Sequence, residues 1–161
     1  MNDAAPGHNF GDDSALLDAW VAVVTATLRT ARVLGEELEA AIGRPMAQAE
    51  VLLRIYRSPE GRLPTTRLAR ELLFTSGGFT KLADRLVGAG LVAREACPTD
   101  RRVTYLTLSD EGRELARRAL QAHAAGVRRH VLDAMGEETL ADWSTAARRL
   151  GGHSGTEPGS R

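Results

Sequence analysis

Residues 65–112 decide the fold: TTRLARELLFTSGGFTKLADRLVGAGLVAREACPTDRRVTYLTLSDEG. The stretch begins with a helical pattern over Thr65–Leu72 and, after a short turn, continues with a second over Ser76–Gly88. Two strand-like runs follow, Leu91–Arg94 and Val103–Leu108, and a polar hairpin tip joins them. Helix, turn, helix and β-hairpin in this order are the outline of a winged helix-turn-helix, an arrangement that serves DNA binding.

The segments on either side of this outline are helical and apolar along one face. Apolar residues recur every three or four positions over 14–42, which predicts one long helix, and a shorter helix is expected over 47–57. Two more helices are expected after the hairpin, over 110–135 and 137–150. Their apolar faces are too extensive for a small winged helix to cover, so we expect exchange between two subunits. The alternative is that the faces cover one another within a monomer.

These patterns predict a mainly α fold of the α+β winged helix-turn-helix type, with six helices, a small β-hairpin wing and an intertwined helical dimer. The expected organisation is a disordered tail over 1–13, an N-terminal dimerisation helix over 14–44, a DNA-binding lobe over 45–109, C-terminal dimerisation helices over 110–150 and a flexible tail over 151–161.

Composition and charge are compatible with this hypothesis. The 161 residues are 43% hydrophobic and 26% charged, and no run approaches the roughly 18 apolar residues of a membrane span. The polar, acidic N-terminus lacks the pattern of a secretory signal, which favours the cytoplasm.

The net charge of the chain is zero, but the charges are unevenly distributed. Residues 62–105 carry eight Lys/Arg and four Asp/Glu, whereas residues 1–61 carry five Lys/Arg and nine Asp/Glu. Such a local basic segment suits a phosphate backbone.

The start of the second helix supplies the candidate base-contacting residues, because the N-terminal residues of a recognition helix meet base edges in the major groove. Phe79 and Leu82 are expected in the core, which turns the polar residues outward. The candidate DNA-binding residues here are the N-cap Thr75, then Ser76, Gly77, Thr80 and Lys81, with Arg85, Arg67 and Arg70 as phosphate contacts. The alternative is an ordinary helical hairpin with a polar outer face.

The hairpin tip supplies the second candidate DNA contact. Arg101 and Arg102 lie where arginine can enter a narrow minor groove, and Asp100 can hold one of them by a charge-assisted hydrogen bond. The sequence does not decide which arginine enters the groove. The alternative is a solvated turn whose charges serve solubility.

At the wing the chain resembles a known family. The spacing Asp100-x-Arg102, five residues, then Leu108-Ser109-x-x-Gly112 is similar to the wing signature of the MarR (multiple antibiotic resistance) regulators, with Ser109 in place of the usual threonine. The stretch Leu82-Ala83-Asp84-Arg85-Leu86, with Gly90-Leu91-Val92, resembles the family's recognition helix and first wing strand. The resemblance implies a homodimer on a pseudo-palindromic operator, a small-molecule or redox signal, and a structural pairing of Asp84 with one wing arginine.

Signals for effector, redox or metal chemistry are sparse. The candidate effector-pocket residues are Trp20, Val24, Leu53 and Tyr56, placed where the family usually has a pocket, with plain core as the alternative. Cys97 is the single cysteine, so no internal disulfide forms. A redox sensor needs a lowered thiol pKa, usually caused by nearby cations, and Arg94, Arg101 and Arg102 are the candidates. His123 and His130 share a helix face and are expected to be solvated or interfacial rather than metal ligands.

No motif of an enzyme is found, neither a Gly-rich phosphate loop, nor a Cys/His metal cluster, nor a nucleophile elbow, so no catalytic residue, cofactor or metal is predicted. The expected function is sequence-specific regulation of transcription, as a repressor or, less often, an activator, by a homodimer on double-stranded DNA under the control of a small-molecule effector. The alternatives are a winged-helix module for protein–protein interaction and a small-molecule-binding protein that binds no DNA.

Overall fold

The computed structural model describes residues 12–153, which fall into two compact units, the chain up to Val33 and the chain from Leu34 onward. The first unit is the N-terminal part of helix α1 (Asp13–Ile42), whose end agrees with the predicted stop. Asp12 caps this helix, because its Oδ1 accepts from the Ser14 N–H at 3.0 Å. Of the predicted tails over 1–13 and 151–161, residues 1–11 and 154–161 lie outside the described residues. Across residues 12–153, no helix has the length and apolarity to cross a membrane.

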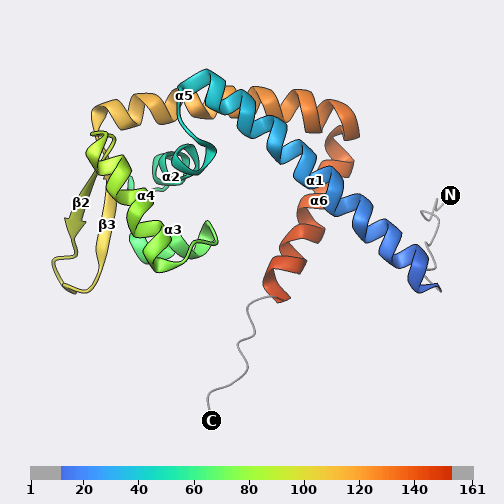
Figure 1. The fold of residues 1–161 in the computed structure, drawn as a ribbon, viewed down its shortest axis with the longest axis horizontal. Helices are drawn as coiled ribbons and strands as arrows, with labels where there is room; N and C mark the ends of the chain where they lie inside the picture. Colours follow the sequence, from blue (N-terminus) through green and yellow to red (C-terminus); the bar gives the residue numbers. More distant parts are fainter. Residues whose placement is uncertain (1–11, 154–161) are drawn as a thin grey trace, which may run out of the picture. The chain divides into compact units, whose positions relative to one another are not determined.

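The second unit carries the winged helix. Its elements are the last turns of α1, then α2 (Met46–Tyr56), β1 (Arg62–Pro64), α3 (Thr65–Glu71), α4 (Ser76–Gly88), β2 (Val92–Ala96), β3 (Thr104–Leu108), α5 (Asp110–Val127), the π-helical turn η1 (Arg128–Leu132) and α6 (Asp133–His153) (Figure 1). The mainly helical fold with a small antiparallel sheet confirms the predicted fold class. The boundaries of α4 match the prediction, and those of α2, α3 and the hairpin strands differ by one or two residues.

The sheet contains a strand that the sequence did not predict. β1 pairs antiparallel with β3, placing Leu63 opposite Leu106, and β3 pairs on its other side with β2, so the order is β1-β3-β2. A run of three residues that includes Pro64 is too short for a periodicity signal, and proline is tolerated there because β1 is an edge strand.

The core lies between the sheet and helices α2, α3, α4 and α5. Phe79 and Leu82 are buried in it, as predicted for the inward face of α4. The largest side chains that are fully buried are Leu38, Leu52, Ile55, Leu68, Leu86, Leu91, Leu106 and Val51. This shared core fixes the position of α4 relative to the hairpin (Figure 1).

Two hydroxyl caps set the helix starts around the wing. The Thr75 Oγ1 accepts from the Gly78 N–H at 3.2 Å, which confirms the expected N-cap of α4. The Ser109 Oγ accepts from the Gly112 N–H at 3.0 Å and donates to the Gly90 carbonyl at 2.6 Å. A Cβ at Gly112 would lie only 1.9 Å from the Leu91 carbonyl oxygen, so glycine lets α5 start directly against the wing.

The C-terminal helices differ in detail from the prediction. The predicted helix over 110–135 is divided by η1, in which Arg128–Leu132 adopt π-helical geometry, so the division into helices departs slightly from the predicted six. Gly136 has φ 78° and ψ 165° and kinks the chain at the predicted break between the last two helices. α6 ends at His153, so residues 151–153, predicted as the start of a flexible tail, are helical.

Candidate nucleic-acid interface

The first turns of α4 present a polar, exposed face. Ser76, Gly77, Thr80 and Lys81 are exposed, as is the cap Thr75. The Thr80 Oγ1 donates to the Ser76 carbonyl at 2.9 Å, which leaves the oxygen of this hydroxyl outward as an acceptor. No heavy atom outside the helix's own backbone comes within 4 Å of a Cβ built on Gly77, so another molecule can approach the backbone there. This face offers a cation, hydroxyls and an open backbone to a ligand.

The cationic side chains of α3 and α4 divide into paired and unpaired groups. Arg67 is held by Glu71, with 2.7 Å between Nε and Oε1, whereas Arg70, Lys81 and Arg85 are exposed and make no ion pair with any part of the chain that the structure describes. The unpaired cations are therefore available to an anionic backbone without loss of an intramolecular bond.

The wing tip is ordered by Asp100. Its Oδ1 accepts from the backbone N–H of Arg102 at 3.0 Å and from the Nε–H of the same residue at 3.2 Å. These bonds hold the pKa of the Asp100 carboxyl below its ordinary value, so it stays ionised beside the arginine. The Arg102 side chain is still 91% exposed, and Arg101 is exposed and makes no ion pair among residues 12–153. Asp100 thus orients one tip arginine and leaves the other free.

Asp84 joins the recognition helix to the wing. Its Oδ1 accepts from Arg94 Nη1 at 2.8 Å, so the wing arginine that pairs with it belongs to strand β2 and not to the tip. The sequence predicted a pairing of Asp84 with one wing arginine, but it indicated Arg94 only as a cation near Cys97. The contact spans ten residues and depends on how β2 lies beside α4, so spacing alone gave no signal for it.

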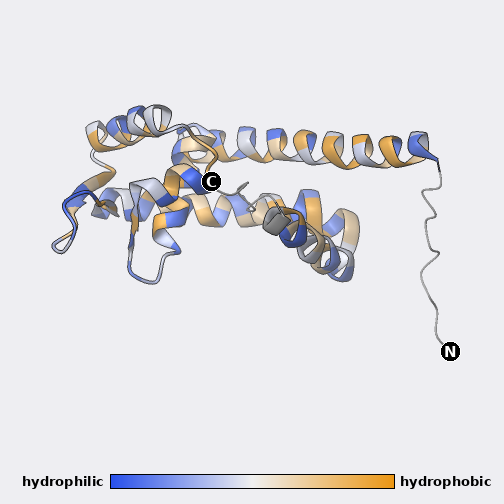
Figure 2. Ribbon diagram, turned by 90° about the horizontal axis from the view of Figure 1, so that it is seen from below, coloured by the Kyte–Doolittle hydropathy of each residue, from blue (hydrophilic) through white to orange (hydrophobic). Residues whose placement is uncertain are grey.

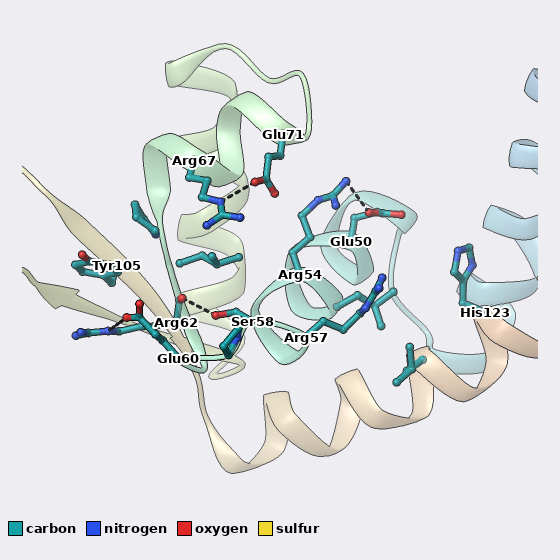
Figure 3. A pocket seen from close by; sticks show the side chains of 15 residues that line it. Glu50, Arg54, Arg57, Ser58, Glu60, Arg62, Arg67, Glu71, Tyr105 and His123 are labelled. Atoms are coloured by element: carbon teal, nitrogen blue, oxygen red, sulfur yellow. Dashed lines mark hydrogen bonds and ion pairs between the residues drawn. The ribbon is translucent and has the colours of Figure 1, made fainter. Parts of the chain in front are cut away.

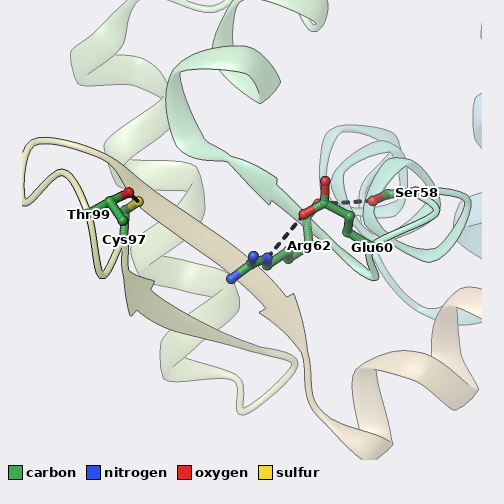
Figure 4. Close-up of polar contacts among 5 residues, drawn as sticks. All are labelled: Ser58, Glu60, Arg62, Cys97 and Thr99. Atoms are coloured by element: carbon green, nitrogen blue, oxygen red, sulfur yellow. Dashed lines mark hydrogen bonds and ion pairs between the residues drawn. The ribbon is translucent and has the colours of Figure 1, made fainter.

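A cavity of about 580 Å³ lies in the same lobe (Figure 3). It is lined by charged residues from α2, the following turn, β1 and α3, with Leu53, Leu63, Leu120, Tyr105 and His123. The Ser58 Oγ donates to the Arg62 carbonyl at 2.9 Å and Arg62 pairs with Glu60, which orders the turn that forms one wall (Figure 4). The Arg62 guanidinium lies 4.6 Å from the centre of the Tyr105 ring.

The cavity holds polar groups without partners. Arg54 pairs with Glu50 at 3.3 Å, but its buried Nε has no hydrogen-bond partner, and neither has the buried Nδ1 of His123. Arg57 is exposed and makes no ion pair with the described residues. Four arginines line the site: Arg54 and Arg57 at the end of α2, Arg62 on β1 and Arg67 on α3. Only the fold brings these three elements together.

The four predicted effector residues are divided between the two units of the chain. Leu53 lines the cavity, and Tyr56 is partly buried against the core. Trp20 and Val24 belong to the first unit, where Trp20 is exposed and Val24 partly buried. The grouping of these residues stays a prediction.

The environment of Cys97 differs from the expected one. Its Sγ lies 3.3 Å from the Thr99 Oγ1 near the tip (Figure 4), and the side chain is partly buried. The hydrogen bond with the Thr99 hydroxyl, helped by backbone N–H groups, lowers the thiol pKa, whereas the charge of Asp100 raises it. The expected cause, the charges of neighbouring arginines, was therefore wrong.

The two histidines have separate surroundings. His130 Nε2 lies 2.7 Å from Glu37 Oε1, and Arg129 lies 3.5 Å from the other oxygen of that carboxylate, so Glu37 connects the end of α1 to η1. His123 lines the cavity instead. Among residues 12–153, no group of three His, Cys, Asp or Glu side chains is arranged to hold a metal ion.

Comparison with known proteins gives consistent matches. A family model described as "MarR family" matches residues 42–103. The HTH-type transcriptional regulator MhqR of Bacillus subtilis (strain 168) is 29% identical over 92 residues, which are 57% of this chain and 63% of that protein, so this chain spans less than two thirds of that relative.

Two solved structures from Streptomyces coelicolor cover more of the chain. AbsC, a MarR family transcriptional regulator, matches with a TM-score of 0.79 at 27% identity, over 88% of this chain and 95% of that one. Sco3205, a MarR family transcriptional regulator solved in complex with DNA, matches with a TM-score of 0.82 at 27% identity, over 93% of this chain and 94% of that one. The wing signature, the winged-helix geometry and these matches together make the chain similar to MarR family regulators in sequence and in fold.

Proposed function

We propose that this protein is a sequence-specific DNA-binding regulator of transcription that acts as a repressor in the cytoplasm. The observation that carries the proposal is the pairing of Asp84 with Arg94, which joins a helix with an open polar N-terminus to a hairpin with an exposed arginine tip. The N-terminus of α4 enters the major groove, and the tip enters the neighbouring minor groove. Ser76, Thr80 and Lys81 contact bases, while Arg70 and Arg85 contact phosphates.

The active form is a homodimer. Figure 2 shows hydrophobic residues along the length of α1. Large apolar side chains are exposed along α1 and on α6, which suits burial against a second copy. They are Leu16, Leu17, Trp20, Val21, Val23, Leu28, Trp143 and Leu150. A two-fold dimer carries two recognition helices, and these fit half-sites about 34 Å apart on a pseudo-palindromic operator.

The arginine-lined cavity is the site of the effector. Its volume of about 580 Å³ lies within the ordinary range of about 300–1,000 Å³ for small-molecule pockets. Unpaired Arg57 and the partnerless Nε of Arg54 favour an anionic ligand, and ion pairs as exposed as Arg67–Glu71 exchange partners at little cost. An occupant that engages Arg62 or Tyr105 acts directly on β1 and β3, and thereby on the wing.

The experiment that tests the proposal is selection of duplexes from a random-sequence pool with the full chain, followed by footprinting. We expect an inverted repeat whose half-sites lie one helical turn apart and a complex of two chains per duplex. Selection of no sequence above background would contradict the proposal and favour a winged-helix module for protein–protein contact.

A further inference from the structure

Leu73 combines an unusual backbone conformation with an unusual exposure. Its φ is 57°, and it is the one non-glycine residue with a positive φ among residues 12–153. Its side chain is 94% exposed, the highest value among the exposed large hydrophobic residues of that range. Leucine in this position therefore adopts a strained conformation without any packing inside the chain.

The backbone of the turn explains the conformation but not the leucine. The Phe74 N–H donates to the Ala69 carbonyl at 2.9 Å and the Leu73 N–H to the Arg70 carbonyl at 3.2 Å, which is the pattern of a helix that ends in a left-handed residue. Glycine or asparagine serves that position best. A leucine here weakens the folded state relative to glycine, so its side chain calls for a role outside the subunit.

The neighbouring residues place Leu73 beside the candidate DNA surface. Phe74 packs edge-on against Phe79, with 6.4 Å between ring centroids, and this contact anchors the turn to the core. Thr75, the cap of α4, follows at once. Leu73 therefore lies two residues before the cap, on the turn that leads into the polar N-terminus of α4.

We propose that Leu73 is a specificity-determining residue that contacts the C5-methyl group of a thymine at the edge of the major groove. The inference rests on the proposed DNA binding and adds a residue to it. A leucine side chain has only apolar atoms, and the thymine methyl is the apolar group of the major groove that carries sequence information. The contact recovers in the complex the burial that the side chain lacks in the free protein.

The test uses a duplex selected by the wild-type protein from a random-sequence pool, in which single thymidines are replaced by deoxyuridine to remove the methyl group. We expect one replacement to weaken wild-type binding roughly fivefold, the effect of losing a buried methyl contact. Leu73→Gly should bind the unmodified duplex roughly fivefold more weakly and be indifferent to that replacement, while its unfolding midpoint does not fall. Leu73→Met, which keeps an apolar side chain, should retain the sensitivity.

Two results would overturn the assignment of Leu73 while leaving the proposed function intact. One is equal affinity of Leu73→Gly and the wild type for the selected duplex. The other is an equal deoxyuridine penalty in both proteins, since the methyl group would then be contacted by another residue. Failure of the wild type to select any duplex is a different result, which contradicts the proposed function and Leu73 with it.

Discussion

Arg94 Nη1 lies 2.8 Å from Asp84 Oδ1, and this ion pair connects strand β2 of the wing to the recognition helix α4. The two side chains are 38% and 55% exposed, so the pair contributes little to stability, about 0.2–1 kcal/mol. Its importance is geometric, because it joins the surfaces of α4 and the wing, the two elements proposed to contact DNA.

Asp84→Asn should therefore reduce specificity more than stability. The free energy of unfolding should fall by at most about 1 kcal/mol, while Arg94, released from its partner, raises affinity for any duplex through its charge. The measurement is the ratio of dissociation constants for a selected and a scrambled duplex, which should fall. Glu95→Gln, the same charge change at an exposed neighbour on β2, is the control. An equal effect of both variants would remove the orienting role of the pair.

Gly112→Ala should be one of the most destabilising single substitutions in the chain. The added Cβ would lie 1.9 Å from the Leu91 carbonyl oxygen, a backbone atom that cannot yield without moving the wing. We expect a loss of roughly 3 kcal/mol or more in urea unfolding. Gly77→Ala is the matched control, because a Cβ there meets open space, and it should raise stability by up to about 1 kcal/mol. Similar midpoints for Gly112→Ala and the wild type would contradict the packing described.

Cys97 should react as a thiolate at lower pH than an ordinary cysteine, because the bond with the Thr99 hydroxyl lowers its pKa. Thr99→Val removes that bond, so the midpoint of the pH profile for alkylation by iodoacetamide should move upward. Thr99→Ser keeps a hydroxyl and should leave the midpoint near that of the wild type. Coincident profiles for the valine variant and the wild type would show that the hydroxyl has no effect on the thiol.

Glu37 should make acid stability depend on its bond with His130. The bond lowers the pKa of the Glu37 carboxyl in the folded state, so the stabilisation is present above the ordinary glutamate pKa of about 4.3 and is lost as the pH falls through the lowered value. The difference in unfolding free energy between the wild type and Glu37→Gln should be largest near pH 6 and shrink in acid. Glu39→Gln is the control on the same helix, and a difference independent of pH would exclude the linkage.

The sequence predicted the winged helix because its signals are local. A hydroxyl cap, an apolar helical period and a short hairpin can each be recognised within about a dozen residues of sequence. The start and end of α4, from its cap Thr75 to Gly88, were therefore predicted correctly. Strand β1 was missed because three residues are too few to show the alternation of a strand. The turn η1 was missed because the sequence of a π-helical turn looks like that of the α-helix around it.

The candidate sites also differ in whether local sequence or contacts between distant elements determine them. The outward face of α4 followed from the inward position of Phe79, which is a local argument. The pairing of Asp84 with Arg94 and the gathering of four arginines around the cavity arise from contacts between elements, and no spacing in the sequence encodes them. The positive φ of Leu73 could not be predicted from the sequence either, because leucine rarely adopts a positive φ.

The most direct test of the central claim, that the wing tip and α4 bind DNA together, is the salt dependence of binding to the selected duplex, followed by fluorescence anisotropy. The account predicts that Arg101→Ala with Arg102→Ala weakens binding and reduces the slope of log K against log salt concentration by about 1–2. A slope equal to that of the wild type would mean that the tip arginines do not contact phosphates, and it would contradict the account.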